Sequence, residues 1–97
     1  MTIKFDHDVV KNESNYEKHG IDFETAQRVF EDPFHASVQD RIVCDEERWQ
    51  TVGMVNGVVL LLVAHTWKEL DNGTIHIRII SARKATAHER KRYENEH

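Results

Sequence analysis

The spacing of hydrophobic residues changes at Pro33. The residues before it that recur at the three- and four-residue intervals of a helix face are Phe23, Ala26, Val29 and Phe30. Asp22 is a good N-cap for this helix, and the Asp32–Pro33 pair ends it. Beyond Pro33, polar and hydrophobic residues alternate or form short apolar runs, as they do in β-strands. The pattern predicts an α+β fold in which helices precede most of the strands.

A short strand and a further helix are predicted at the start of the chain. Ile3–Phe5 is the candidate strand. Asp8 is suited to cap a helix that continues to about Lys18, and Gly20 supplies the left-handed residue that commonly ends a helix. The apolar face of this helix is weak, so the sequence leaves its packing open.

Four strands are predicted after Pro33. Their ranges are His35–Val43, Arg48–Val55, Val58–Thr66 and Thr74–Ser81. Asn56–Gly57 is the strongest hairpin signal in the chain, and Asp71–Gly73 marks a second turn. The third of these strands is nearly all apolar, as expected of a central strand that is buried on both faces. The short connections predict an antiparallel arrangement.

The last predicted strand has two distinct faces, because side chains alternate along a strand. The residues on one face are Ile75, Ile77 and Ile79. His76 and Arg78 point the other way. The helices should cover the isoleucine face, which leaves His76 and Arg78 on the opposite side of the sheet.

A capping box begins a closing helix. Thr86 and Glu89 have the spacing at which each side chain accepts a hydrogen bond from the backbone N–H of the other. The helix is shorter than the roughly 12–15 residues at which isolated helices begin to hold, and Ala87 and Tyr93 are almost its whole apolar content. We expect it to dock on the sheet and to be the most mobile element. The predicted fold is thus a short N-terminal strand and two helices packed on one face of an antiparallel sheet, followed by a short C-terminal helix.

Composition limits the classes to which this chain can belong. Its 97 residues form one domain, residues 1–97, without repeats or low-complexity segments. The longest apolar run, Val58–Ala64, is far short of the ~20 residues of a membrane helix, and the first residues lack the apolar core of a signal peptide. The single cysteine, Cys44, excludes an internal disulfide. A cytoplasmic protein is expected, because thiols stay reduced there.

Charge is divided unevenly along the chain. Residues 1–47 contain 12 acidic residues and 5 Lys or Arg, whereas residues 48–97 contain 5 acidic residues and 8 Lys or Arg. The net charge of −4 therefore hides a C-terminal half that is positive. Such a half could face phosphate groups, although a solvated charged surface is the simpler interpretation of composition alone.

The junction of the last strand and the last helix gathers most of these cations. They are Arg78, Arg83, Lys84, Arg90, Lys91 and Arg92. An arginine in the middle of a strand must pair, reach solvent or bind an anion. Arginine forks beside a tyrosine and a carboxylate suit a phosphodiester, because planar guanidinium binds phosphate oxygens bidentately. The alternative is an Arg78 salt bridge and a solvated basic helix. No spacing of His and Cys resembles a zinc site, so no metal or cofactor is predicted.

Three separated blocks resemble the BrnT family of ribonuclease toxins from bacterial type II toxin–antitoxin systems. They are KHGIDFETAQRVFEDP (Lys18–Pro33), ERW (Glu47–Trp49) and RIISARKATAHERKRYE (Arg78–Glu94), in register over nearly the whole chain. The resemblance implies a RelE-like α+β fold with RNA bound on the side of the sheet opposite the helices. It also implies a cognate DNA-binding antitoxin and operator DNA contacted only through the toxin–antitoxin complex, and it is compatible with a homo-oligomer.

The resemblance also implies site residues. The polar positions that match the family are Asp8, Asn12, Lys18, His19, Arg48, Arg78, Ser81, Arg83, Glu89, Arg90 and Tyr93. The expected catalytic residues are His19, Arg48, Arg78 and Tyr93, and the expected phosphate-binding residues are Lys18, Arg83, Lys84 and Arg90. The arginines would clamp the phosphate and the transition state. His19 is the matching residue whose side chain suits proton transfer near neutral pH, although it could equally be a structural residue at a helix end.

Two functions remain in competition. The first is a metal-independent endoribonuclease toxin that cleaves RNA and inhibits translation and growth until its antitoxin neutralises it. The second is an inactive relative that binds the antitoxin and contributes to operon autoregulation. The second draws on departures from the family near the N-terminus, where His7 replaces the usual tryptophan and Val9 a common proline.

Overall fold

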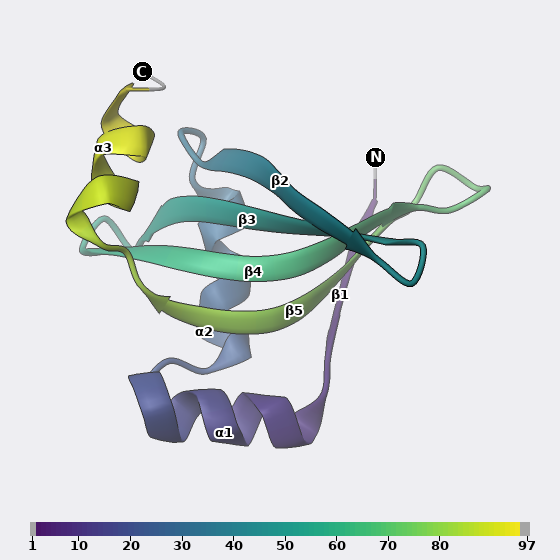
Figure 1. Ribbon diagram of the computed structural model, residues 1–97, viewed down its shortest axis with the longest axis horizontal. Helices are drawn as coiled ribbons and strands as arrows, with labels where there is room; N and C mark the ends of the chain where they lie inside the picture. The colour runs from purple at the N-terminus through teal and green to yellow at the C-terminus, as the bar shows by residue number, and fades with distance from the viewer. Residues whose placement is uncertain (1, 96–97) are drawn as a thin grey trace.

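The strand order brings the two ends of the sequence together. The computed structural model describes residues 2–95, in which β1 (Ile3–His7) pairs in parallel with β5 (Ile75–Lys84). The other strands are β2 (Ala36–Val43), β3 (Glu46–Val55) and β4 (Val59–Glu69), all paired antiparallel, and the sheet order is β1-β5-β4-β3-β2 (Figure 1). The α+β class is confirmed. The predicted N-terminal strand is present at one edge of the sheet, and its parallel pairing with β5 differs from the antiparallel arrangement that the short connections predict.

The first helix begins and ends where the sequence predicted. α1 (Val9–His19) starts at Asp8, whose carboxylate accepts hydrogen bonds from the next turn, and stops at Gly20, whose φ is 69°. The buried Asn15 side chain donates to the carbonyl of Ala82 and accepts from its N–H, at 2.8 and 3.0 Å. Asn15 therefore continues the edge pairing of β5 beyond the end of β1.

The second predicted helix is two elements rather than one. α2 (Phe23–Ala26) passes into a 3₁₀ helix, η1 (Gln27–Glu31), which Asp32 ends. The backbone of η1 lies directly on β3, since a Cβ built on Gly53 would come within 2.8 Å of the Val29 carbonyl oxygen. Gly53 is thus required by close approach of two backbones, and the tighter 3₁₀ turn accompanies this contact.

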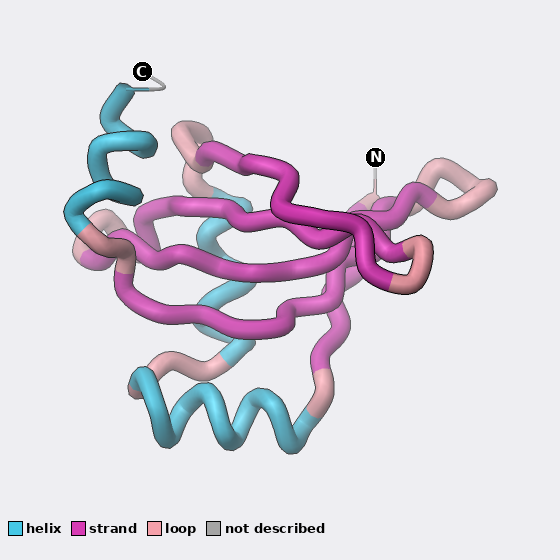
Figure 2. Tube along the Cα trace, in the orientation of Figure 1, coloured by secondary structure: helices cyan, strands magenta, loops and turns pink. Residues whose placement is uncertain are grey.

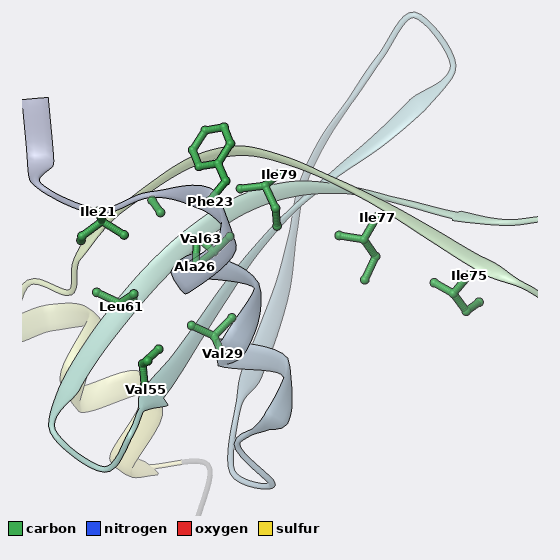
Figure 3. Close-up of a cluster of buried hydrophobic side chains, with 11 residues drawn as sticks. Ile21, Phe23, Ala26, Val29, Val55, Leu61, Val63, Ile75, Ile77 and Ile79 are labelled. Carbon is green, nitrogen blue, oxygen red and sulfur yellow. The ribbon is translucent and has the colours of Figure 1, made fainter. Parts of the chain in front are cut away.

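The main core lies between these helical segments and the sheet. Ile75, Ile77 and Ile79 are 2%, 0% and 1% exposed, so the predicted covered face of β5 is confirmed. They pack with Phe23 and Val29 and with residues of β3 and β4, as Figure 3 shows. Burying each of these isoleucine side chains contributes about 1.5–3 kcal/mol.

The opposite face of the sheet is covered at one end only. α3 (Ala87–Asn95) crosses that end, and Tyr93 packs there on a small cluster formed by Ala36, Val52, Leu60 and Leu62. Figure 2 shows α3 on one side of the sheet and α1 and α2 on the other. The rest of this face is not covered by any helix of residues 2–95, and we call it the open face.

Candidate functional site

A row of polar residues crosses the open face. The strand register aligns Arg48 on β3 with Thr66 on β4, and Arg78 on β5 with Asp6 on β1. The N–H of Arg78 donates to the Thr66 hydroxyl at 3.0 Å, so Arg48 and Arg78 flank Thr66. Cross-strand neighbours of this kind lie ~4.5–5.5 Å apart. Arg41 on β2 is the register partner of Arg48 and extends the row.

Two carboxylates separate the cations of this row. Arg48 Nη2 lies 3.4 Å from Glu46 Oε1, and Arg78 Nη1 lies 3.9 Å from Glu46 Oε2. Asp6 Oδ2 lies 3.7 Å from Arg78 Nε and 3.8 Å from His76 Nε2. These contacts are longer than good hydrogen bonds between charged groups. We call Asp6, Glu46, Arg48, His76 and Arg78 the open cluster.

The guanidinium of Arg48 has a hydrogen-bond donor without an acceptor among residues 2–95. Its Nε is buried and has no hydrogen-bond partner within residues 2–95. A buried donor without a partner costs free energy, and a bound anion would remove that cost. A small hollow of about 190 Å³ opens beside it and is lined in part by Arg41, Arg48 and Ser81.

Lys18 and His19 lie at the β5 edge of the sheet. Both are exposed at the end of α1 and line a hollow of about 270 Å³ with Ile80 and Ser81. Ile80 and Ser81 also line the hollow that contains Arg48. The predicted residues Lys18 and His19 therefore lie next to the open cluster, with Ile80 and Ser81 between them and Arg48. Among residues 2–95, no hydrogen bond or ion pair joins His19 to Arg48 or Arg78.

Arg83 belongs to a separate, closed pair. Its Nη1 and Nη2 donate to Glu89 Oε1 and Oε2, both at 2.8 Å. Glu89 also accepts from the Thr86 N–H at 2.9 Å, and its own N–H donates to the Thr86 hydroxyl, so the predicted capping box is confirmed. The hydrogen bonds from Arg83 above all lower the pKa of Glu89 to about 2. We call Thr86, Arg83 and Glu89 the closed cluster.

Tyr93 is also engaged within the fold. Its hydroxyl donates to Asp32 Oδ2 at 2.6 Å, and Asp32 accepts from the Met54 N–H at 2.8 Å. Partial burial and the hydrogen bond to Asp32 raise the pKa of Tyr93 to about 12. Met54 lies six residues along β3 from Arg48, which is roughly 20 Å in a strand. The structure does not bring Tyr93 to the open cluster, and its catalytic role stays a prediction.

The remaining predicted residues, Lys84 and Arg90, lie beside α3. Both are exposed, and neither forms an ion pair with another residue in the range 2–95. Their role as phosphate contacts also stays a prediction. Within the same residues, no group of three or more His, Cys, Asp or Glu side chains is arranged to hold a metal ion. No helix among them has the length and apolar character needed to cross a membrane.

The residues predicted from the sequence do not include three members of the open cluster, Asp6, Glu46 and His76. Asp6 reaches Arg78 through the parallel pairing of β1 with β5, which the sequence does not predict. The strand that contains Arg48 is predicted to start at Arg48, whereas β3 starts at Glu46. His76 was placed on the correct face but was not selected. The spacing of two residues, from Glu46 to Arg48 and from His76 to Arg78, is the signal that could have found both, because it puts side chains on one face of a strand.

Known proteins include a family and a solved structure that match this chain. A search of curated protein sequences found no match. The crystal structure of the Brucella abortus ribonuclease toxin BrnT superposes with a TM-score of 0.58 at 20% sequence identity, over 89% of this chain and 99% of that one, and so supports the fold. The sequence model of the family described as "Ribonuclease toxin, BrnT, of type II toxin-antitoxin system" matches residues 7–89. The chain therefore belongs to the BrnT family of ribonuclease toxins.

Proposed function

We propose that this protein is a metal-independent endoribonuclease that cleaves RNA on the open face of its sheet. The observation that carries this proposal is the pair of arginines, Arg48 and Arg78, on either side of Thr66, with the buried Nε of Arg48 left without a hydrogen-bond partner among residues 2–95. Both guanidinium groups reach the same Glu46 carboxylate, at 3.4 and 3.9 Å, so both could hold the non-bridging oxygens of one phosphate. They would also neutralise the charge that develops on the phosphorane.

The substrate in this proposal is RNA because the nucleophile is the ribose 2′-hydroxyl. Its attack on the adjacent phosphate needs a base, an acid and cationic stabilisation, and no metal ion. Arginine stays charged at all relevant pH values, so Arg48 and Arg78 bind and stabilise rather than transfer protons. Lys18 and His19 lie next to the open cluster, beside Ile80 and Ser81. They would contact the nucleotides that flank the bound phosphate. Lys84 and Arg90 would extend this contact toward α3.

A cognate antitoxin is the expected partner, because the family belongs to type II toxin–antitoxin systems. In the proposal the antitoxin neutralises the toxin in the cytoplasm, and only the complex binds operator DNA. An inactive relative that binds its antitoxin is the competing function. The replacement of the usual tryptophan by His7 does not by itself favour it, since the His7 ring packs edge-on against Phe23 at 5.6 Å and so fits the core.

Cleavage of RNA by the purified protein tests the proposal. Single-stranded RNA and ribosome-bound messenger RNA are each incubated with the protein in the presence of EDTA. We expect cleavage by the wild type and its loss in an Arg48→Ala, Arg78→Ala double variant. Arg28→Ala is the matched control, because Arg28 is an exposed, ion-paired arginine on the other side of the sheet. Intact RNA under all conditions, together with normal growth on expression, would favour the inactive relative.

A further inference from the structure

We propose that Glu46 is the general base and His76 the general acid of this site. The inference rests on the proposed function and adds to it the two residues that transfer protons. Neither residue is among those that the sequence resemblance implied. Both belong to the open cluster, each two positions before one of its arginines on the same strand.

The contacts reach the Arg78 guanidinium from its two ends: Glu46 contacts it directly, and His76 is linked to it through Asp6. Glu46 Oε2 lies 3.9 Å from Arg78 Nη1, and Asp6, which contacts Arg78 Nε, lies 3.8 Å from His76 Nε2. A phosphate held by Arg48 and Arg78 would therefore have a carboxylate toward β3 and an imidazole toward β1. An in-line displacement needs this arrangement, because the attacking and leaving oxygens lie on opposite sides of phosphorus.

The proton balance of the step follows from these positions. The Glu46 carboxylate takes the proton of the 2′-hydroxyl as the new O2′–P bond forms. The P–O5′ bond breaks, and the protonated His76 imidazole gives its Nε2 proton to the departing 5′-oxygen. The products are a 2′,3′-cyclic phosphate and a free 5′-hydroxyl, with no other reactant. Arg48 and Arg78 stabilise the extra negative charge between these two transfers.

The loose contacts of Glu46 distinguish it from a structural salt-bridge residue. Its distances to Arg48 and Arg78 are 3.4 and 3.9 Å, and it makes no side-chain hydrogen bond with them. Glu89, by contrast, accepts two hydrogen bonds of 2.8 Å from Arg83. Glu46 also follows a hairpin turn in which Cys44 and Asp45 have φ values of 51° and 64°. Positive φ at both loop residues is the usual geometry of a two-residue hairpin, and here the turn makes Glu46 the first residue of β3.

Charged groups from four strands face the two residues. They are Lys4 and Asp6 on β1, Arg48 on β3, Lys68 on β4 and Arg78 on β5. Lys68 is the register partner of His76. In this environment we expect cleavage to require ionised Glu46 and protonated His76. The rate should therefore pass through a maximum with pH.

Two isosteric or near-isosteric variants test the assignment on an RNA oligonucleotide whose cleaved bond has been mapped with the wild type. We expect Glu46→Gln and His76→Gln each to lower kcat/KM by about 100-fold or more, because loss of a general acid or base costs ~10²–10⁴ in rate. Glu46→Gln should also remove the acidic limb of the pH profile, and His76→Gln the alkaline limb. Glu47→Gln and His88→Gln are matched controls, since Glu47 hydrogen-bonds Trp49 instead and His88 is exposed on α3. The controls should stay within about threefold of wild type, and melting curves verify that all four variants fold.

A substrate with sulfur in place of the scissile 5′-oxygen separates the two roles. A thiolate leaves without being protonated, so the His76→Gln variant should recover most of its rate on this substrate. Glu46→Gln should remain slow. If both variants cleave like their controls, the assignment is wrong while the proposed function stands. If His19→Ala, rather than His76→Gln, is rescued by sulfur, the acid is His19. A wild-type protein that cleaves neither substrate, with or without ribosomes, overturns the proposed function as well.

Discussion

Arg78 and Arg83 lie five residues apart on β5 and face the same side of the sheet, yet their surroundings differ. Arg83 makes two hydrogen bonds of 2.8 Å with Glu89, beneath α3. Arg78 lies 3.7 Å from Asp6 and 3.9 Å from Glu46, and its guanidinium makes no hydrogen bond within residues 2–95. The same side chain thus stabilises the fold at one end of the strand and remains available for a ligand at the other.

The position of α3 explains this difference. Where α3 covers the sheet, water is partly excluded and an arginine must be paired to be tolerated. Beyond α3, the Arg78 side chain is 47% exposed, and solvent satisfies its charge at little cost. Arg48 is 27% exposed and keeps a buried Nε without a partner within residues 2–95. Cationic groups near one another in the sequence can therefore have opposite roles.

The largest effect should follow from replacing an arginine of the open cluster. We expect Arg48→Ala to lower the rate of RNA cleavage by about 10²–10³, the cost of removing one electrostatic stabiliser of a transition state. The melting temperature should change little, because the partner of Arg48, Glu46, makes no hydrogen bond to it. Arg48→Lys keeps the positive charge but lacks the planar guanidinium that can donate two parallel hydrogen bonds, so it should recover part of the rate. Equal rates for Arg48→Ala and wild type would show that the open cluster is not the site.

The buried His65 provides a second test of how the surroundings of a side chain set its properties. His65 is 1% exposed, its Nε2 accepts from Thr51 at 2.7 Å, and burial lowers its pKa from 6.5 to about 4. Because the pKa of His65 is lower in the folded protein than in the unfolded chain, the unfolded chain binds the proton more readily than the folded protein does. The free energy of unfolding should therefore fall as pH drops from 6.5 to 4. The loss is about 3 kcal/mol at 1.36 kcal/mol per pKa unit.

Unfolding by urea at a series of pH values measures this loss. The His65→Gln variant should be less stable at pH 7 but should lose much less stability between pH 6.5 and 4. An unchanged acid dependence in His65→Gln would mean that another group carries the effect.

Opening the closed cluster should have a smaller effect on stability and almost none on chemistry. Glu89→Gln removes the charged acceptor of Arg83 and should cost roughly 1–2 kcal/mol, a value reduced because the Arg83 side chain is 38% exposed. Since the folded pKa of Glu89 is lowered to about 2, its contribution is present above pH 4.5 and is lost as pH falls toward 2. Thermal melting at pH 7 and pH 3 should show a difference between variant and wild type that shrinks at the lower pH.

The smallest effect is expected for the hydroxyl of Tyr93. Tyr93→Phe removes its hydrogen bond to Asp32 and should cost about 1 kcal/mol of stability. RNA cleavage should remain within a few-fold of wild type if Tyr93 serves to hold α3. A hundredfold loss of cleavage with an unchanged melting temperature would instead support the catalytic role that the sequence resemblance implies.

Local patterns in the sequence predicted most of the fold. The caps at Asp8 and Gly20, the capping box of Thr86 and Glu89, and the alternation along β5 all specify their elements through contacts with near neighbours. The break between α2 and η1 could not be predicted in this way. It depends on close approach of the backbone of η1 to Gly53, which lies on a strand that comes later in the chain.

The candidate site was predicted less completely, for the same reason. The sequence identified Arg48 and Arg78, but only the strand register shows that Thr66 lies between them. It also grouped Arg83 with them, because distance along the chain cannot reveal that Glu89 occupies the Arg83 fork. Charge pattern thus indicates the composition of a binding face, and tertiary pairing decides which charges remain available.

The most direct test of the difference between the open and closed clusters replaces Arg78 and Arg83 separately by alanine. Cleavage of RNA and thermal melting are measured on the same samples. We predict that Arg78→Ala loses cleavage by about 10²-fold or more and keeps its melting temperature. Arg83→Ala should melt several degrees lower, as expected for a loss of about 1–2 kcal/mol in a domain of this size, and should keep most of its cleavage at a temperature where it is folded. The opposite pattern, in which Arg83→Ala abolishes cleavage and Arg78→Ala only lowers the melting temperature, would contradict the assignment of both clusters.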